Sequence, residues 1–282
     1  MASSIWQSFL PQHVIQDLLA HPGQPATGRA QKFQAVVLFS DVSGFTAISE
    51  RLGAVGKSGT EELTTLLNSY FDPMIALIHS FGGIIGKFGG DAMTVFFPCE
   101  PETRARVARQ AVRCALEMQA KMGAYAALQT SVGVYGLTMK AGLAEGTIFC
   151  TTVGDPALRL EYILAGPPLD LCAEAEHHAV AGEVVVHRGL FEAAENLALV
   201  KTEGDFSWVN GVGGARGENP PQAFPYPEIL PGEALQTIAA FMHPSIAQRL
   251  RDDQLSFLNE HRKVTVLFVN FAALDYENDP QA

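Results

Sequence analysis

The chain has 282 residues, of which 48% are hydrophobic, and its formal net charge is −11. This composition supports a core of ordinary size, and the acidic balance argues against a nucleic-acid-binding surface, which needs clustered Lys and Arg. The first residues lack the basic and apolar regions of a signal peptide, and no run approaches the roughly 18 apolar residues of a membrane span, so we expect a cytoplasmic protein.

Patterns of apolar and turn residues predict the elements in chain order. An amphipathic helix over residues 3–21 is followed by a polar linker and by the apolar run Val36–Phe39, which is typical of a buried strand. Next we expect helices over 43–52 and 60–81, the second capped by Ser58, then a hairpin of strands 84–88 and 93–97, and a helix over 104–122. The remaining predictions are strands over 137–143, 147–153 and 158–164, a helix over 168–178, and closing segments over 183–187 and 197–209. This order predicts an α+β fold with helices on one face of a largely antiparallel sheet.

A Pro- and Gly-rich stretch over residues 211–232 marks a boundary, and the sequence after it repeats the start of the chain. At an offset of 232, the residues Phe9, Leu10, Val14, Gln16 and Leu18 correspond to Phe241, Met242, Ile246, Gln248 and Leu250. At an offset of 229, residues 35–41 correspond to 264–270, where Asn270 replaces Asp41. Chance similarity of two amphipathic helices is the alternative, but the strand match in the same order favours a repeat. We predict an N-terminal helix and linker (1–31), one domain (32–210), a linker with a helix (211–262) and the first strand of a truncated second domain (263–282).

Two carboxylates stand where predicted strands end. Asp41 follows the buried run, and Asp91 lies in the Gly-rich turn of the hairpin. If the first strand lies beside the hairpin, both side chains reach the same rim of the sheet and suit Mg²⁺, which prefers hard oxygen ligands shared with phosphates. The carbonyl of Val42 could add a ligand. The N–H groups near Ser43, Gly44, Phe45 and Thr46, at a helix start, and the flexible backbone of Gly90 could approach phosphate oxygens.

Each aspartate also has a simpler interpretation. Asp41 could cap the following helix, and Gly-Gly-Asp is a common turn sequence. For each aspartate taken singly, the simpler interpretation is favoured. The two carboxylates and the order of elements together are a much more specific signal for a metal site.

The stretches FSDVSGFTAISE (39–50) and IIGKFGGDAMTVFF (84–97) resemble the catalytic domain of class III adenylyl and guanylyl cyclases. The resemblance covers about residues 34–209 and is nearest to the first catalytic domain of the tandem, soluble, bicarbonate-responsive adenylyl cyclases. It implies a ferredoxin-like core and conversion of ATP to 3′,5′-cyclic AMP and pyrophosphate. It also implies two Mg²⁺ or Mn²⁺ ions held by Asp41 and Asp91, with the Val42 carbonyl as a further ligand.

The chain departs from the family pattern where a second domain is expected to contribute. An active site of this family lies between two domains, one with the metal aspartates and one with a purine-selecting Lys and an Asn-x-x-x-Arg pair. In GPPLDLCAEAE (166–176), Asp170 occupies the Asn position and Glu174 the Arg position. An acidic residue cannot stabilise negative charge growing on a phosphate. We therefore predict that this domain supplies only the metal-binding half, that a second cyclase domain completes the site, and that the chain alone has little activity.

Lys87 matches a basic position that lines a degenerate, bicarbonate-binding pocket in the tandem soluble cyclases. The arginine that completes that pocket is not evident, because Ala173 stands near its place, so a regulatory anion pocket and a solvated strand-end lysine are equally good interpretations.

Three other functions compete. A diguanylate cyclase is disfavoured because Gly89-Gly90-Asp91 is followed by Ala92-Met93 rather than by a second acid. A degenerate cyclase-like domain that binds nucleotide and regulates a partner is a serious alternative. Guanylate cyclase activity is a third, because the residues that would select the purine lie beyond Ala282.

Overall fold

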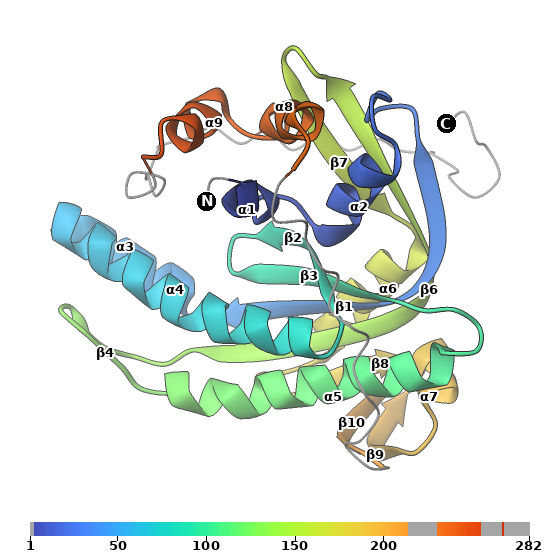
Figure 1. Ribbon diagram of the computed structural model, residues 1–282. Coiled ribbons are helices and arrows are strands. Elements are labelled where there is room, and N and C mark those ends of the chain that lie inside the picture. The colour runs from blue at the N-terminus through green and yellow to red at the C-terminus, as the bar shows by residue number, and fades with distance from the viewer. Residues whose placement is uncertain (1–2, 214–229, 255–266, 268–282) are drawn as a thin grey trace.

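The computed structural model describes residues 3–213, 230–254 and 267 (Figure 1). The helices that pack on the main sheet are α3 (Phe45–Val55), α4 (Lys57–Ser80), α5 (Arg104–Met122), α6 (Pro167–His178) and α7 (Arg188–Ala194). Four further helices lie near the two ends of the described chain: α1 (Ser3–Gln7), α2 (Gln12–Ala20), α8 (Gly232–Ala240) and α9 (Pro244–Arg251). A short 3₁₀ turn spans Gly123–Tyr125.

One sheet dominates the fold. Its strands are β1 (Ala30–Ser43), β2 (Ile84–Gly89), β3 (Ala92–Pro98), β6 (Thr138–Asp155), β7 (Arg159–Ala165), β8 (Val184–His187), β9 (Leu197–Glu203) and β10 (Phe206–Val212). Their order is β2-β3-β1-β6-β8-β10-β9, with β7 also paired to β6, and β6–β8 is the parallel pair among antiparallel ones. Strands β4 (Leu128–Thr130) and β5 (Gly133–Tyr135) form a separate hairpin. The α+β class expected from the sequence is confirmed.

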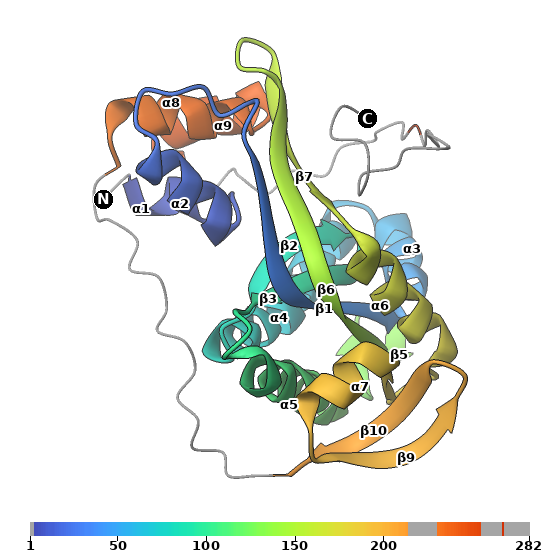
Figure 2. The ribbon, with the colours of Figure 1, turned by 90° about the vertical axis from the view of Figure 1, so that its right-hand side faces the viewer.

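The sheet is covered on both faces, and this corrects the expectation of helices on one face. On one face, Val36 and Leu38 of β1 pack in the main core with side chains from α3, α4, α5 and α7. On the other face, Ala35 and Val37 pack in a second cluster with Cys172 of α6. Figure 2 shows α5 and α6 on opposite sides of β1 and β6. A strand buried on both faces has no polar positions to alternate, which explains the continuous apolar run.

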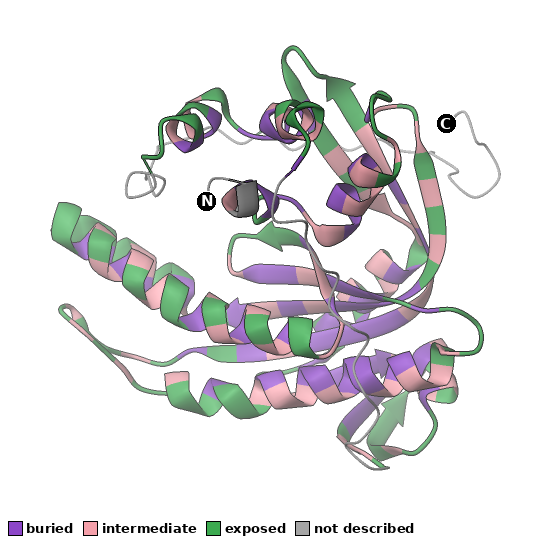
Figure 3. Ribbon diagram, in the orientation of Figure 1, coloured by how far each residue is buried: buried purple, intermediate pink, exposed green. Residues whose placement is uncertain are grey.

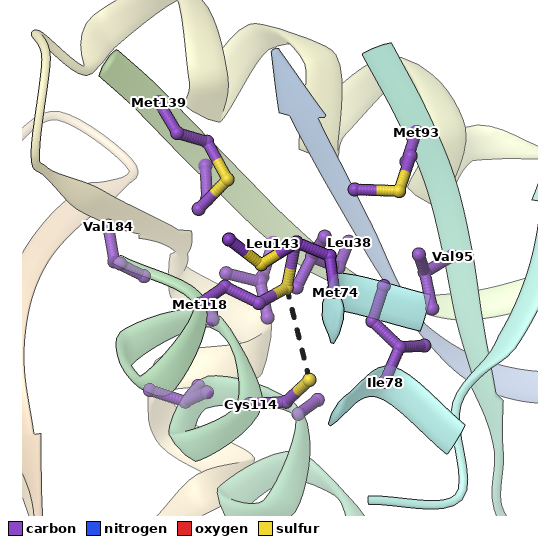
Figure 4. Close-up of a cluster of buried hydrophobic side chains, with 14 of the residues drawn as sticks. Leu38, Met74, Ile78, Met93, Val95, Cys114, Met118, Met139, Leu143 and Val184 are labelled. Carbon is purple, nitrogen blue, oxygen red and sulfur yellow. Dashed lines mark hydrogen bonds between the residues drawn. The ribbon is translucent and has the colours of Figure 1, made fainter. Parts of the chain in front are cut away.

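The main core is rich in methionine and branched aliphatic side chains. Burial is concentrated along the sheet and the facing stripes of the helices, as the burial colouring in Figure 3 shows. In Figure 4, side chains of α4, α5 and the strands β1, β3, β6 and β8 meet around Met118, whose sulfur lies 4.0 Å from that of Cys114. Flexible methionine side chains fill irregular gaps of this kind, so the core holds α4 and α5 firmly against the sheet.

Strand β6 is longer than expected. The sequence predicts two strands around a turn at residues 144–146, but β6 runs unbroken from Thr138 to Asp155. It pairs with β1 at every position from Ser43↔Thr138 to Ala30↔Thr151, and this continuous partner keeps residues 144–146 extended. Beyond the main sheet, β6 and β7 form a protruding two-stranded ribbon, which we call the arm (Figure 2).

The first predicted helix is two helices, because the chain breaks before Pro11. Pro11 has φ −58° and ψ 146°, which are extended values, and it precedes α2 directly. Proline has no N–H and its ring opposes continuation of a helix, so α1 and α2 form a bent pair. Together with α8 and α9 they form a small bundle against the arm, which we call the cap (Figure 2).

Two further expectations need correction and one lies beyond the description. Helix α4 starts at Lys57 after Gly56, without a side-chain cap, so Ser58 lies inside it rather than before it. The closing segment over 197–209 is a hairpin of β9 and β10. The predicted first strand of a second domain (263–282), with Asn270, falls outside the described residues apart from Leu267. Within the described ranges, no helix is both long and apolar enough to cross a membrane.

Candidate active site

Asp41 lies inside β1, close to its end. It lies opposite Lys140 of the neighbouring strand β6, and β1 continues for two further residues to Ser43. Helix α3 begins after Gly44, and no side chain accepts a hydrogen bond at its N-cap. Asp41 is therefore not the cap of that helix, so the capping interpretation is wrong. Its carboxylate is half-buried at the rim of the sheet.

Asp91 reaches the same rim from the neighbouring hairpin. It stands in the turn between β2 and β3, and β3 pairs directly with β1. The last pair of that register is Ser40↔Met93, so the strand end that carries Asp41 lies beside the turn that carries Asp91. The two strand-end carboxylates of the sequence thus meet at adjacent positions in space.

The charges of the two carboxylates interact. Burial raises the pKa of Asp91, its own backbone N–H lowers that pKa in part, and the negative charge of Asp41 raises it further. Near them, Tyr70 of α4 is fully buried. Its pKa is raised first by burial, then by Tyr125, and then by Asp91 and Asp41. A half-buried carboxylate whose ionisation is disfavoured by burial and by a neighbouring negative charge forms, with that neighbour, a site that a cation would relieve.

The donor set at this rim fits a hard divalent cation. In the described part of the chain, neither Asp41 nor Asp91 has an ion-pair partner that would compete for its oxygens. The same part holds no group of three or more His, Cys, Asp and Glu residues that could bind a metal without help. Two carboxylates leave several coordination positions open, which suits an ion that shares its remaining ligands with water, backbone carbonyls and phosphates.

The backbone beside Asp41 makes a sharp turn into α3. Gly44 has φ +112°, and a Cβ there would lie 2.5 Å from the carbonyl oxygen of Gly136. Only glycine fits this position, and it directs the first N–H groups of α3 toward the rim. Ser43 and Thr46 are exposed, Phe45 is buried, and Gly90 in the hairpin turn has φ +72° with open space around it. These are the residues predicted to approach phosphates.

Helix α6 lies on the face of the sheet to which Asp41 and Lys140 belong. A Cβ at Gly142 of β6 would lie 2.1 Å from the carbonyl oxygen of Cys172, so this glycine permits very close packing of the helix. Lys140 reaches from β6 to Glu176 of α6, with 2.8 Å between nitrogen and oxygen. Asp170 and Glu174, one turn apart, are both exposed on the helix, so its accessible stripe is acidic.

Lys87 already has partners on the arm. Its ammonium nitrogen lies 3.4 Å from a carboxylate oxygen of Glu161 and 5.2 Å from the ring centre of Tyr162. Its charge is therefore balanced by an acid rather than left open for an anion.

Two residues of this region were not singled out from the sequence as site residues. Tyr70 falls within the predicted helix over 60–81, and its position close to the carboxylates depends on how α4 crosses the sheet. Lys140 is separated from Asp41 by 99 positions, and only the β1–β6 register reveals that they are neighbours.

Comparison with known proteins assigns the family. The profile described as "Adenylate and Guanylate cyclase catalytic domain" matches residues 29–215, more than half of the chain. The chain belongs to the adenylate and guanylate cyclase catalytic domain family. This cyclase domain is 30% identical over 169 residues to adenylate cyclase type 10 of Rattus norvegicus, covering 59% of the chain and 10% of that protein. The human adenylate cyclase type 10 is 23% identical over 276 residues, which cover 87% of the chain and 17% of that protein.

Solved structures agree with this assignment. The guanylyl cyclase Cya2 superposes with a TM-score of 0.54 at 27% identity, covering 68% of the present chain and 98% of its own. The chain spans about a tenth to a sixth of the length of the two curated relatives, so their whole-protein properties do not transfer to it directly.

Proposed function

We propose that this cyclase domain is the metal-binding half of an adenylate cyclase in the cytoplasm. It would act with a second cyclase domain to convert ATP to 3′,5′-cyclic AMP and pyrophosphate. The observation that carries the proposal is that Asp41 and Asp91 lie side by side at one rim of the sheet, with interacting charges and no ion-pair partner among the described residues. The relatives named adenylate cyclase favour ATP as the substrate.

The reaction needs little covalent work from side chains. The ribose 3′-oxygen of ATP forms a bond to the α-phosphorus, its proton leaves, and the bond from the α-phosphorus to the β-bridging oxygen breaks to release pyrophosphate. Positioning and charge stabilisation account for most catalysis of this type. In this chain the N–H groups at Ser43, Gly44, Phe45 and Thr46, together with Gly90, would orient the phosphates.

Asp41 and Asp91 would hold two Mg²⁺ or Mn²⁺ ions, with the Val42 carbonyl as a further ligand. When bound, such ions supply positive charge that favours ionisation of the 3′-hydroxyl and balances charge on the departing pyrophosphate. The role of the two carboxylates is to stay ionised, close together and in fixed orientation. The paired strands β1, which carries Asp41, and β6 would provide that rigidity.

The acidic stripe of α6 suggests that a second domain must supply part of the active site. Asp170 and Glu174 are exposed where the family pattern has an Asn and an Arg, so this helix repels phosphate. The purine-selecting and phosphate-stabilising side chains would come from another domain, supplied by a continuation of the chain or by a partner. The isolated chain should therefore have little cyclase activity.

The test has two parts. With Mn²⁺ and ATP, the purified 282-residue chain should form cyclic AMP at close to background rate, and robust production would refute the divided site. Joined to its natural continuation, it should be active, and Asp41→Ala should reduce the rate at least about 100-fold, because a metal ligand contributes several kcal/mol. Asp72→Ala, an exposed acid on α4, is the matched control and should change little.

Two alternatives correspond to different outcomes of these assays. If the joined protein binds ATP but forms no cyclic nucleotide, the domain is a regulatory, nucleotide-binding relative. If it forms cyclic GMP from GTP faster than cyclic AMP from ATP, it is a guanylate cyclase, the activity for which Cya2 is named. The anion pocket at Lys87 stays a prediction, and an incoming anion would have to displace the carboxylate of Glu161.

A further inference from the structure

The cap is built from two copies of one helix–break–helix motif. Helix α2 starts at Gln12 and helix α9 starts at Pro244, a separation of 232 positions, which is the offset of the sequence repeat. The helix before the break is α1 in the first copy and α8 in the second, and α1 is the shorter of the two. The repeat seen in the sequence is thus also a repeat of local structure.

Equivalent residues of the two copies occupy equivalent places in one hydrophobic cluster. Four pairs separated by 232 positions are buried together in it: Trp6 with Ile238, Leu10 with Met242, Ile15 with Ala247, and Leu18 with Leu250. Leu160 of β7 joins the same cluster. The two like motifs therefore share one buried cluster, to which each contributes equivalent positions.

The two copies are attached to the rest of the chain differently. Helix α2 is fixed by polar contacts: Asp17 accepts hydrogen bonds from Arg29 and Gln31, and the Nε2 of His13 lies 3.0 Å from the sulfur of Cys150 on β6. The second copy meets the first through the apolar cluster. The first helix pair is therefore anchored to the cyclase domain, and the second helix pair packs onto the first.

We propose that the cap is a pairing module, in which the helix pair that precedes each cyclase unit docks onto the helix pair of the other unit. The first pair leads into β1, and the second leads toward residues 264–270, whose sequence matches β1. Docking α8–α9 onto α1–α2 would then hold a second cyclase unit of the same chain to the first. The identity of that second unit as a cyclase domain rests on the proposed function, whereas the pairing of the helices does not.

Complementation between two full-length variants tests the module. Ile15→Asp places a charge in the first pair, and Ile238→Asp places one in the second; both isoleucines are fully buried. Alone, each variant should lose amide-exchange protection in both helix pairs at least about tenfold, while β1 and β3 keep theirs. Mixed in equal amounts, the two variants each still carry one intact pair. They should form a dimer of twice the 30.3 kDa chain mass by light scattering, with protection restored in the two intact pairs.

Gln236→Asp is the matched control, because it adds the same charge at an exposed position of α8 and should alter neither protection nor mass. If either aspartate variant loses protection in β1, the milder Ile15→Ala and Ile238→Ala replace the pair. Retained protection in the single variants, or a mixture that stays monomeric, would overturn the proposal. Asp41→Ala separates it from the catalytic assignment, since that variant should keep a closed cap.

Discussion

Lys140 of β6 and Glu176 of α6 form an ion pair, 2.8 Å between nitrogen and oxygen, with the Glu176 side chain only 4% exposed. Lys140 is also the residue opposite Asp41 in the pairing of β1 with β6. The ion pair therefore links α6 to β6 next to the candidate site. Loss of one member of such a pair leaves a buried charge without compensation.

Lys140→Met should therefore destabilise the protein by roughly 3 kcal/mol in chemical denaturation, because Glu176 remains buried. The double variant Lys140→Met, Glu176→Leu should recover most of that loss. Lys57→Met is the control, since its pair with Glu61 is 3.8 Å long and highly exposed, and it should cost less than about 0.5 kcal/mol. A single variant as stable as the wild type would show that the pair is not important.

Asp91→Asn should make the metal-free protein more stable at neutral pH. Burial and the charge of Asp41 raise the pKa of Asp91 in the folded state, so the ionised folded form is penalised once the pH exceeds the unfolded value of about 4. The melting temperature of the variant should exceed that of the wild type at pH 7 in chelator, and the two should converge near pH 3.

Divalent ions should reverse this order. With millimolar Mn²⁺ the wild type should gain stability and Asp91→Asn should not, because binding to the native state alone stabilises it. Asp72→Asn should respond to Mn²⁺ as the wild type does. An equal gain in Asp91→Asn would place the metal elsewhere.

The cap should loosen in mild acid through His13. Burial lowers the pKa of His13 from 6.5 to about 4, with a smaller opposing effect of Asp17. A histidine with a depressed folded pKa contributes full stability above about pH 6.5, and that contribution is lost as the pH falls toward 4. The emission of Trp6, buried in the cap, should shift to longer wavelength over this range.

His13→Phe should flatten that pH dependence, because phenylalanine keeps the ring contacts with Phe96 and Tyr162 and cannot be protonated. His177→Phe, at an exposed histidine of α6, should leave the transition unchanged. The same acid transition in His13→Phe as in the wild type would assign it to other groups.

Asp170→Asn combined with Glu174→Arg should give the isolated chain measurable cyclase activity. The double change would restore the pair that the family pattern has on this helix, so two copies of the chain could complete each other's sites. The rate with Mn²⁺ should rise at least about tenfold above the parent, a change of roughly 1.4 kcal/mol, with poor choice between ATP and GTP. Asp170→Asn with Glu174→Gln should stay at background, and equal activity in the two double variants would contradict a role for the arginine.

The sequence was sufficient for the class of fold and for the two carboxylates. Asp41 and Asp91 each lie next to an apolar strand segment, and such segments are what local patterns locate best, although β1 runs two residues past Asp41 to Ser43. The distribution of helices over both faces was missed, because the apolar run of β1 shows that the strand is buried but not what buries it. The unbroken β6 was missed for a related reason, since residues 144–146 have the composition of a turn and only pairing with β1 keeps them extended.

The surroundings of the site depend on contacts between distant residues. Tyr70 lies near the two carboxylates because the core side chains hold α4 against the sheet, and no local pattern encodes that proximity. The ion pair of Lys140 with Glu176 depends on Gly142, which lets α6 approach β6 closely. The break at Pro11, in contrast, could have been predicted from the proline alone.

The length of β1 has a mechanical consequence. Ala30 begins the strand beside the cap, and Asp41 lies eleven residues further on, which is roughly 36 Å of extended chain at about 3.3 Å per residue. The strand bends along this length (Figure 2), but every intervening position is paired with β6, so the two paired strands move together. A displacement of the strand where the helix pairs dock would therefore be transmitted along the paired strands to the end that carries Asp41. The strand that carries one predicted metal ligand therefore couples the geometry of the candidate metal site to the packing of the cap.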